Sequence, residues 1–370
     1  MKRIVSLILS VLFLLFFAPQ PAAASPAVSA ESFCLLDAHT GESLYSHAEN
    51  KPLPMASTTK IMTALVVLEN ADVYQKVEIP PAAIGAEGSS MYLFPGEKLT
   101  VLDLLYGLLL ESANDAANAL ALLCAGAIPA FAQKMNERAQ SIGMLNSNFV
   151  NPSGLPVEGH LSSARDLALL LAEAMKNELF CLITSEKEKR IEYKPGAYQT
   201  LINHNRLLRS YPYCTGGKTG YTLAAGRCLV TAAEKDGKRL IAATLNDPAD
   251  WADHKALFEY GFSLFEKKEI LPGDFVRAVP VAGGAGNAAL FSNPEAVSFF
   301  VKTGEEYSIE ILSPPFLYAP IFKGEILFAS VRQGGRELRR FSLTAQNEVP
   351  YLHTPSFWER FCLSLKRMLS

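Results

Sequence analysis

The chain has 370 residues, 19% of which are charged, and its formal net charge at pH 7 is −3. This length is enough for two or three domains with real hydrophobic cores. The balanced charge gives no reason to expect a nucleic-acid partner. The six cysteines include no C-x-x-C pair and the six histidines show no metal-ligand spacing. We therefore expect mostly buried free thiols, no metal site and no cofactor.

The N-terminus has the order of a secretory signal peptide. Two basic residues precede an apolar run over residues 4–18, and small residues follow. This order predicts export, with residues 1–24 as the signal peptide and cleavage as late as Ala30. The apolar run is short for a spanning helix, although an uncleaved anchor stays open.

The next hundred residues alternate strand and helix patterns. Residues 32–47 predict two short strands joined by a turn at Thr40-Gly41. A helix-like apolar run follows Ser57, and Thr100 with Asp103 forms a capping-box pattern before another apolar helix. A polar break at 111–115 then separates two segments that should both bury apolar faces, so this break needs a reason.

The second half of the chain changes character near residue 268. A helix is expected to begin at Ser162 or Ser163, and three strands follow within 214–245, two of them joined by a turn at Asp236-Gly237. Over 275–349 the helical periodicity is lost, and short alternating strands predict a separate all-β domain.

Ser57 and Lys60 are the first residues that suggest chemistry. In "ASTTKIMTALVVLE" they stand three positions apart at a helix start, so they share one helical face. An apolar setting disfavours the ammonium form of a lysine, and a neutral amine can accept a proton from serine. A helix cap beside a solvated lysine would explain the same pattern, so this pair needs partners.

Two further motifs supply those partners. The polar break contains Ser112-Ala113-Asn114, the only S-x-N in the chain, and "TGGKTGYT" places Lys218-Thr219-Gly220 on a strand. S-x-x-K, an S-D-N-like motif and K-T-G together are the signature of penicillin-binding proteins and class A β-lactamases. All three occur here in that order, at a helix start, in an interhelix loop and on a strand.

The blocks around these motifs resemble the serine-type D-alanyl-D-alanine carboxypeptidases, which are low-molecular-weight penicillin-binding proteins. They include "LLYGLLLESANDAANALA", "GHLSSARDLA" and "GGKTGYTLAAGRCLVTAA". The resemblance implies a penicillin-binding and β-lactamase-like α/β (α+β) catalytic domain over 31–267, with a five-stranded antiparallel sheet and a helical subdomain. A small β-sandwich-like domain is expected over 268–350.

The resemblance also implies a role for each motif residue. Ser57 would be the acylated nucleophile, Lys60 its base, and Ser112 a proton relay. Asn114 would hold the substrate amide. The remaining expected substrate-binding residues are Lys218, which supplies positive charge, Thr219, a hydroxyl donor, Gly220, and Tyr221, whose backbone N–H would form the oxyanion hole with that of Ser57.

The implied reaction is hydrolysis of the terminal D-Ala from peptidoglycan stem pentapeptides through a serine acyl-enzyme that penicillin inhibits. A β-lactamase is disfavoured because Glu158 lacks the Glu-x-x-x-Asn context of class A enzymes. A non-catalytic wall-binding module would predict a damaged triad, which the chain does not have. An endopeptidase or a transpeptidase acting on the same type of bond stays open.

Several neighbouring residues depart from the family pattern or imitate it. An arginine that some relatives place beyond the last strand is missing from "NDPADWADHKAL", so carboxylate recognition would rest on Lys218 and Thr219, or on Lys255. A second Lys-Thr-Gly at Lys302 lacks the flanking glycines and predicts a solvated hairpin turn. His160 and His204 are expected to be mainly structural.

The tail, residues 355–370, predicts an amphipathic helix. Phe357, Trp358, Phe361 and Leu365 follow i, i+3/i+4 spacing, and basic residues exceed acidic ones. Such a helix lies in a membrane interface, although docking on the β-rich domain would bury the same face. The expected location is the outer face of the cytoplasmic membrane, facing the cell wall.

Overall fold

The structure is a computed structural model that describes residues 24–194, 196–352, 356, 358, 361–362 and 364–365. The chain divides into two compact units, Met1–Leu264 and Phe265–Ser370, which are treated separately below. Nearly all of the expected signal peptide and most of the expected tail helix lie outside the described residues.

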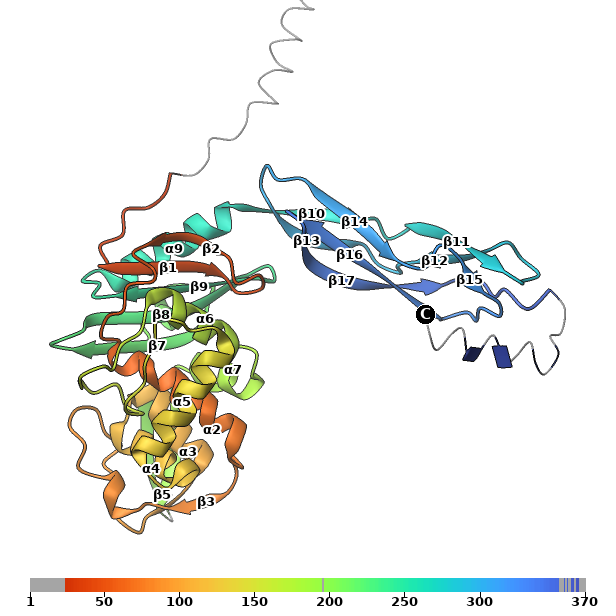
Figure 1. The fold of residues 1–370 in the computed structure, drawn as a ribbon. Coiled ribbons are helices and arrows are strands. Elements are labelled where there is room, and N and C mark those ends of the chain that lie inside the picture. Colours follow the sequence, from red (N-terminus) through yellow and green to blue (C-terminus); the bar gives the residue numbers. More distant parts are fainter. Residues whose placement is uncertain are drawn as a thin grey trace, which may run out of the picture. The chain divides into compact units, whose positions relative to one another are not determined.

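A five-stranded antiparallel sheet forms the centre of the N-terminal unit (Figure 1). Every pair of neighbouring strands is antiparallel, which confirms the predicted sheet. In spatial order the strands are β2 (Ser43–His47), β1 (Ser32–Asp37), β9 (Lys238–Leu245), β8 (Gly226–Lys235) and β7 (Cys214–Thr222). Because β7 is last in this order, one of its edges faces away from the sheet.

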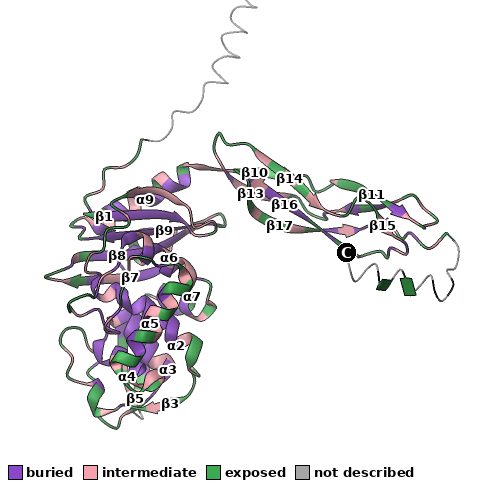
Figure 2. Cartoon of the chain, viewed as in Figure 1, coloured by how far each residue is buried: buried purple, intermediate pink, exposed green. Residues whose placement is uncertain are grey.

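Helices cover both faces of this sheet, so most residues of its central strands are buried (Figure 2). Helix α6 (Ala164–Ala174) and helix α9 (Asp250–Ser263) both pack on β1, β8 and β9. Cys34 and Leu36 of β1 join the core shared with α6. The intervening Leu35 points the other way, toward Gly261 of α9. This double burial explains why β8 and β9 read as continuous apolar runs.

The rest of this unit is mainly helical and surrounds the start of α2. It includes α2 (Lys60–Asn70), α3 (Val101–Tyr106), α4 (Asn114–Ala125), α5 (Ile128–Ile142), α7 (Glu178–Ser185) and the one-turn α8 (Leu207–Ser210). Two small hairpins complete it, β3 (Lys76–Glu78) with β4 (Lys98–Thr100) and β5 (Glu188–Lys194) with β6 (Ala197–Ile202).

Predicted caps and turns in this unit are confirmed. Thr100 and Asp103 form a complete capping box at the start of α3. Ser163, not Ser162, caps α6 by accepting a hydrogen bond from the Asp166 N–H. Within the described residues, no single helix has the length and apolar composition to cross a membrane, and the bent pair α4 and α5 meets that test only when taken together.

The C-terminal unit is built from strands, as predicted. A six-stranded sheet has the order β14, β16, β17, β12, β11, β15, and β10 pairs with β13. Their bounds are β10 (Phe265–Leu271), β11 (Val276–Ala282), β12 (Ala288–Ser292), β13 (Val297–Lys302), β14 (Tyr307–Leu312), β15 (Leu317–Tyr318), β16 (Ile326–Gln333) and β17 (Arg336–Ala345). A small core that includes Phe291 and Leu343 holds the larger sheet together.

The second Lys-Thr-Gly lies in this unit, in the turn that follows Lys302. The Lys302 ammonium pairs with Glu305 at 3.5 Å. The expected hairpin is wrong, because β13 pairs with β10 whereas β14 pairs with β16. The backbone of Lys302 is instead held by the side chain of Gln333, so the turn connects two sheets.

Candidate functional site

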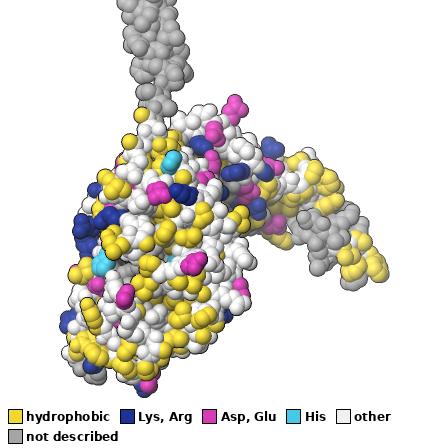
Figure 3. Space-filling model, turned by 60° about the vertical axis from the view of Figure 1, so that its left-hand side comes forward, with side chains coloured by type: hydrophobic (Ala, Val, Ile, Leu, Met, Phe, Trp, Pro, Cys, Tyr) yellow, Lys and Arg dark blue, Asp and Glu magenta, His cyan; other side chains and the backbone are white. Residues whose placement is uncertain are grey.

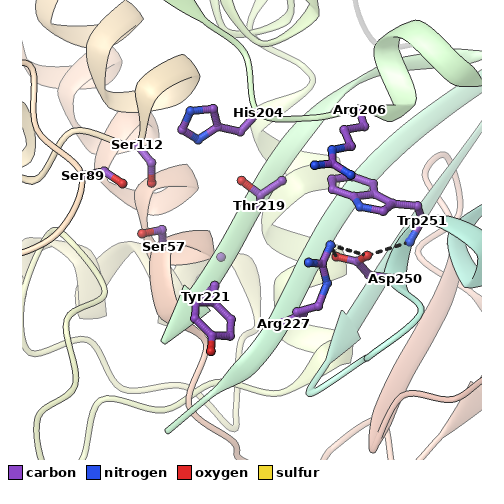
Figure 4. A pocket seen from close by; sticks show the side chains of 11 residues that line it. Ser57, Ser89, Ser112, His204, Arg206, Thr219, Tyr221, Arg227, Asp250 and Trp251 are labelled. Carbon is purple, nitrogen blue, oxygen red and sulfur yellow. Dashed lines mark hydrogen bonds and ion pairs between the residues drawn. The ribbon is translucent and has the colours of Figure 1, made fainter. Parts of the chain in front are cut away.

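A cavity of about 310 Å³ brings most of the predicted site residues together (Figure 4). Its lining consists of Ser57, Ser89, Ser112, His204, Arg206, Thr219, Gly220, Tyr221, Arg227, Asp250 and Trp251. In Figure 4 the three serines lie on one side of it, and Arg206, Arg227 and Trp251 lie on the other. Lys60, Asn114 and Lys218 do not line it, because all three are buried behind its wall.

Ser57 lies in a short 3₁₀ turn, η1 (Ala56–Thr59), directly before α2. Ala56 has a φ of 47°, which non-glycine residues adopt rarely. A Cβ added to Gly154 would lie 1.9 Å from the Ala56 carbonyl oxygen, so only a glycine allows this close approach. The strained turn is therefore held by its surroundings, and backbone strain of this kind is common at functional sites.

The Lys60 amine is fully buried beside the Ser57 hydroxyl. Its Nζ lies 2.9 Å from Ser57 Oγ, 2.7 Å from Asn114 Oδ1 and 2.6 Å from the Ser153 carbonyl oxygen. Burial lowers the pKa of Lys60 well below its usual value; the charge of Lys218 acts in the same direction, and Asp115 opposes both. A neutral amine at this position is the expected result.

The three contacts of Lys60 fix how a neutral amine is oriented. Asn114 Nδ2 donates to the Glu87 carbonyl, so Asn114 Oδ1 must be the acceptor that faces Lys60. A neutral amine has two N–H groups, and Asn114 Oδ1 with the Ser153 carbonyl uses both. Its lone pair is then directed at the hydroxyl of Ser57.

Ser112 ends a short π-helical segment, η3 (Gly107–Glu111), and has left-handed backbone angles with φ of 61°. The segment interrupts the path from α3 to α4, and it turns the Ser112 hydroxyl into the cavity beside Ser57 (Figure 4). π-Helical insertions of this kind are frequent at functional sites. The polar break at 111–115, which the sequence alone did not explain, therefore forms one wall of the cavity.

Strand β7 supplies the opposite wall through its outer edge. The hydroxyl of Thr184 exchanges hydrogen bonds of 2.9 Å with both the N–H and the C=O of Gly217. The N–H and C=O of Gly217 therefore point away from β8. Main-chain groups two residues apart on a strand point the same way, so the N–H and C=O of Thr219 and Tyr221 also point away from β8. A Cβ added to Gly220 would lie 3.0 Å from the Ser57 nitrogen, which places this edge against Ser57.

Lys218 is buried on the same strand. Its Nζ donates to the Thr219 carbonyl at 3.0 Å. Burial lowers the pKa of Lys218 to about 7, although Glu111 favours the charged form. A lysine in this state can lose or gain its charge near neutral pH.

Several cavity residues were not predicted from the sequence. Arg227 of β8 donates through Nη2 to both carboxylate oxygens of Asp250, at 2.8 and 2.9 Å. Its guanidinium also lies 5.7 Å from the Trp251 ring. Basic side chains gather on one face of this unit (Figure 3). Arg227 lies 23 positions before the adjacent pair Asp250 and Trp251, and this spacing gives no local signal, so only the fold reveals the group.

His204, expected to be structural, also lines the cavity. Its Nε2 lies 3.5 Å from Glu111. Burial and the charge of Lys218 lower the pKa of His204, and Glu111 opposes them. Glu111 also accepts a hydrogen bond from the Ile202 N–H, so it ties the loop of His204 to the π-helical segment.

A serine next to a buried lysine, at the edge of a five-stranded antiparallel sheet, defines the class of penicillin-interacting serine enzymes. The sequence profile of the D-alanyl-D-alanine carboxypeptidase family (Peptidase_S11) matches residues 19–249. The chain belongs to this family.

Individual relatives agree with this assignment. The chain is 34% identical over 369 residues to the D-alanyl-D-alanine carboxypeptidase DacF of Bacillus subtilis, covering 94% of this chain and 95% of that one. Among solved structures it is similar to penicillin-binding protein 5 of Haemophilus influenzae, with a TM-score of 0.65, 28% identity, and coverage of 89% and 99%. A D-alanyl-D-alanine carboxypeptidase of Mycobacterium tuberculosis gives a TM-score of 0.63 at 35% identity, covering 66% of this chain and 96% of that one.

Proposed function

We propose that Ser57 is the nucleophile with which this D-alanyl-D-alanine carboxypeptidase removes the terminal D-Ala from peptidoglycan stem pentapeptides. The observation that supports this most directly is the buried Lys60 amine, 2.9 Å from Ser57 Oγ, with two acceptors that take up its N–H groups. This arrangement leaves a lone pair for the proton of Ser57, which is what a serine nucleophile requires.

Each site residue has a separate role in the proposed reaction. Lys60 accepts the Ser57 proton as Oγ attacks the carbonyl carbon of the penultimate D-Ala. The N–H groups of Ser57 and Tyr221 stabilise the negative charge on the carbonyl oxygen. Ser112 gives its proton to the amine of the departing D-Ala as the peptide bond breaks and takes up the proton held by Lys60, so both groups return to their starting states. Water then hydrolyses the ester on Ser57 and releases the shortened peptide.

Within this reaction Asn114 positions the substrate amide, while Lys218 and Thr219 provide positive charge and a hydroxyl donor. A β-lactam would acylate Ser57 by the same route, because its strained amide presents the same carbonyl to the same groups. The stable product would be a penicilloyl ester on Ser57 that blocks the cavity.

The carboxylate of the terminal D-Ala requires a cation in the cavity. Lys255 is not among the described lining residues, and Lys218 is buried, whereas Arg206 and Arg227 line the cavity. We assign the carboxylate to Arg227, because Asp250 fixes its guanidinium in one orientation and a pre-oriented arginine loses little entropy on binding.

An amidated substrate tests the role of Arg227. The wild type should prefer a pentapeptide with a free terminal carboxylate over its amide, and Arg227→Gln should reduce that preference about 10- to 100-fold, the range for a charged hydrogen bond. Lys255→Gln is the matched control and should keep the preference. If Arg227→Gln discriminates as well as the wild type, another group binds the carboxylate.

Labelled penicillin tests the nucleophile. The purified protein should become covalently labelled, and Ser57→Ala should abolish both this labelling and the release of D-Ala from a synthetic pentapeptide, read by mass spectrometry. Ser89→Ala removes another hydroxyl from the same cavity and should still be labelled. Labelling of a folded Ser57→Ala protein would contradict the assignment.

We also propose that the exported enzyme is held at the outer face of the cytoplasmic membrane by residues 355–370. Among the described positions of this tail, Trp358, Phe361 and Leu365 expose 71%, 52% and 45% of their surface, which leaves them available to a lipid interface. Removal of residues 355–370 should release active enzyme from vesicles of anionic phospholipid. Continued flotation of the truncated protein with the vesicles would exclude the tail as the anchor.

A further inference from the structure

His160 contacts the nucleophile turn from outside the cavity, and nothing above assigns it a role in the reaction. Its Nδ1 accepts a hydrogen bond of 3.0 Å from the backbone N–H of Val150. Its Nε2 lies 2.8 Å from the hydroxyl of Thr59. The ring is buried and packs edge-on against Phe149, with ring centroids 6.0 Å apart.

These contacts determine which nitrogen of His160 carries the proton. A backbone N–H can only donate, so Nδ1 presents its lone pair to Val150. The Thr59 hydroxyl donates its own hydrogen to the Ala56 carbonyl at 2.8 Å, so its oxygen must accept from Nε2–H. Burial and the nearby Lys60 lower the pKa of His160 to about 4, which agrees with a neutral ring.

The carbonyl that receives this chain of hydrogen bonds belongs to the strained residue. Ala56 has a φ of 47°, and its carbonyl oxygen is enclosed between the Thr59 hydroxyl and Gly154. The Ala56 carbonyl and the Ser57 N–H belong to the same planar peptide unit, and the Ser57 side chain is attached to the next Cα. Rotation of the Ala56 carbonyl would therefore move the nucleophile and one donor of the proposed oxyanion hole together.

The loop that carries His160 also holds the base. Its Ser153 carbonyl accepts from Lys60, and Asn151 Oδ1 fixes that part of the loop by accepting from the N–H groups of Ser153 and Gly154. The bond from Val150 to His160 joins the two ends of this loop. One loop thus fixes the Lys60 amine from one side and the Ser57 turn from another.

We propose that neutral His160 is a positioning residue for acylation: through Thr59 it fixes the Ala56 carbonyl, and so the orientation of Ser57 toward Lys60. His160 does not touch the substrate or exchange protons in the reaction. This inference rests on the proposed function, because it requires that Ser57 is the nucleophile.

Two substitutions of His160 separate positioning from stability. Gln can place its amide nitrogen near the position of Nε2, so His160→Gln keeps a donor to Thr59 but leaves the Val150 N–H unpaired. Asn can place its amide oxygen near Nδ1, so His160→Asn keeps the bond to Val150 and loses Thr59. We expect His160→Asn to slow acylation by penicillin about 10- to 100-fold, the cost of a misplaced reacting group. His160→Gln should acylate within about threefold of the wild type, with a lower melting temperature.

Threonine variants supply the matched control. Thr59→Val removes the hydroxyl that His160 contacts and should slow acylation as much as His160→Asn, and the double variant should be no slower than either. Thr244→Val removes an equally buried hydroxyl on β9, which lies 3.1 Å from His254 Nε2 and belongs to neither the nucleophile turn nor the loop of His160. It should lower the melting temperature and leave the acylation rate near that of the wild type.

The measurements are the second-order rate of labelling by fluorescent penicillin and the melting temperature of each full-length variant. Wild-type labelling rates in both His160→Asn and Thr59→Val would overturn the positioning role. Slowing in Thr244→Val that matches Thr59→Val would show a merely structural effect and would overturn it as well. Failure of the proposed function is distinguishable, because it would appear as labelling of Ser57→Ala.

Discussion

The two units of the molecule differ in what their interiors contain. The described part of the N-terminal unit buries three lysines, Lys60, Lys218 and Lys238, together with many other polar groups. The described part of the C-terminal unit buries only Asn293, Ser330 and Gln333 among polar residues. Burying a charge or an unpaired polar group reduces stability. Lys238 is paired with Asp37 at 2.6 Å, whereas Lys60 and Lys218 have no carboxylate partner among the described hydrogen bonds and ion pairs, so the burial of these two lysines near Ser57 carries an energetic cost.

The largest expected effect is on the two buried lysines of the site, Lys60 and Lys218. Lys60→Arg retains a charge that cannot be lost near neutral pH, so acylation by penicillin should fall by at least about a thousandfold. Lys218→Arg keeps the positive charge and should retain more of the rate. The comparison uses labelling rates of folded variants, and equal losses in both would contradict the assignment of Lys60 as the base.

The next effect concerns the close approach of β7 to the nucleophile turn. A Cβ at Gly220 would lie 3.0 Å from the Ser57 nitrogen and 3.1 Å from the Met55 carbonyl oxygen, so Gly220→Ala should push this edge away from Ser57. We expect a loss of about 100- to 1,000-fold in the acylation rate, as for a lost oxyanion donor. Gly237→Ala, at a turn where a Cβ would meet nothing, is the control for activity.

A smaller effect should appear in the pH dependence of stability. Burial lowers the pKa of His254 to about 3, while its ring contacts Thr231 and Thr244 between α9 and the sheet. Between pH 6.5 and 3 the unfolded chain binds a proton at this histidine that the folded chain does not, so stability rises with pH across this window. Relative to His254→Gln, the wild type should gain up to about 1.4 kcal/mol per pH unit in the free energy of unfolding.

This prediction is checked by denaturant unfolding between pH 6 and 4.5, following the transition that shifts when penicillin is bound. That transition reports the N-terminal unit. Burial raises the pKa of Asp247 to about 6, so this residue makes stability fall as pH rises. Asp247 is present in both proteins, and its effect therefore cancels in the difference between their stabilities. Parallel stability curves for the two proteins would contradict the prediction.

The smallest expected effect is in the C-terminal unit. Lys302 repeats the Lys-Thr-Gly motif, yet it pairs with Glu305 at 3.5 Å in a turn between two sheets. Lys302→Ala should leave the acylation rate within about twofold of the wild type and change stability by about 0.5 kcal/mol or less, as for an exposed pair. A large loss of acylation would show that this unit contributes to the chemistry.

The sequence predicted the motif-bearing parts of the site because each lies in a strong local pattern. Ser57 and Lys60 begin an apolar helix, Thr100 and Asp103 form a recognisable cap, and the continuous apolar strands match a sheet covered on both faces. Hydrophobic periodicity and capping chemistry are local properties, so a single chain displays them.

Other parts of the site could not be predicted because they depend on contacts between distant segments. The Ser153 carbonyl reaches Lys60 across 93 positions, and His160 reaches Thr59 across 101. A backbone carbonyl has no residue signature at all. The expected hairpin after Lys302 failed for the same reason, since strand pairing depends on which distant strand offers a free edge.

The hydroxyl of Thr184, near the end of α7, limits what can bind at the outer edge of β7. By bonding to both main-chain groups of Gly217, it ends the hydrogen-bonding edge there. Beyond it lie the main-chain groups of Tyr221 and of Thr219, whose carbonyl already accepts from Lys218. An edge this short cannot template a long strand from another protein, which protects the molecule against edge-to-edge aggregation. We expect the remaining edge to pair with only the last two residues of a bound peptide. Thr184 would then limit how many residues of the ligand can form hydrogen bonds with β7.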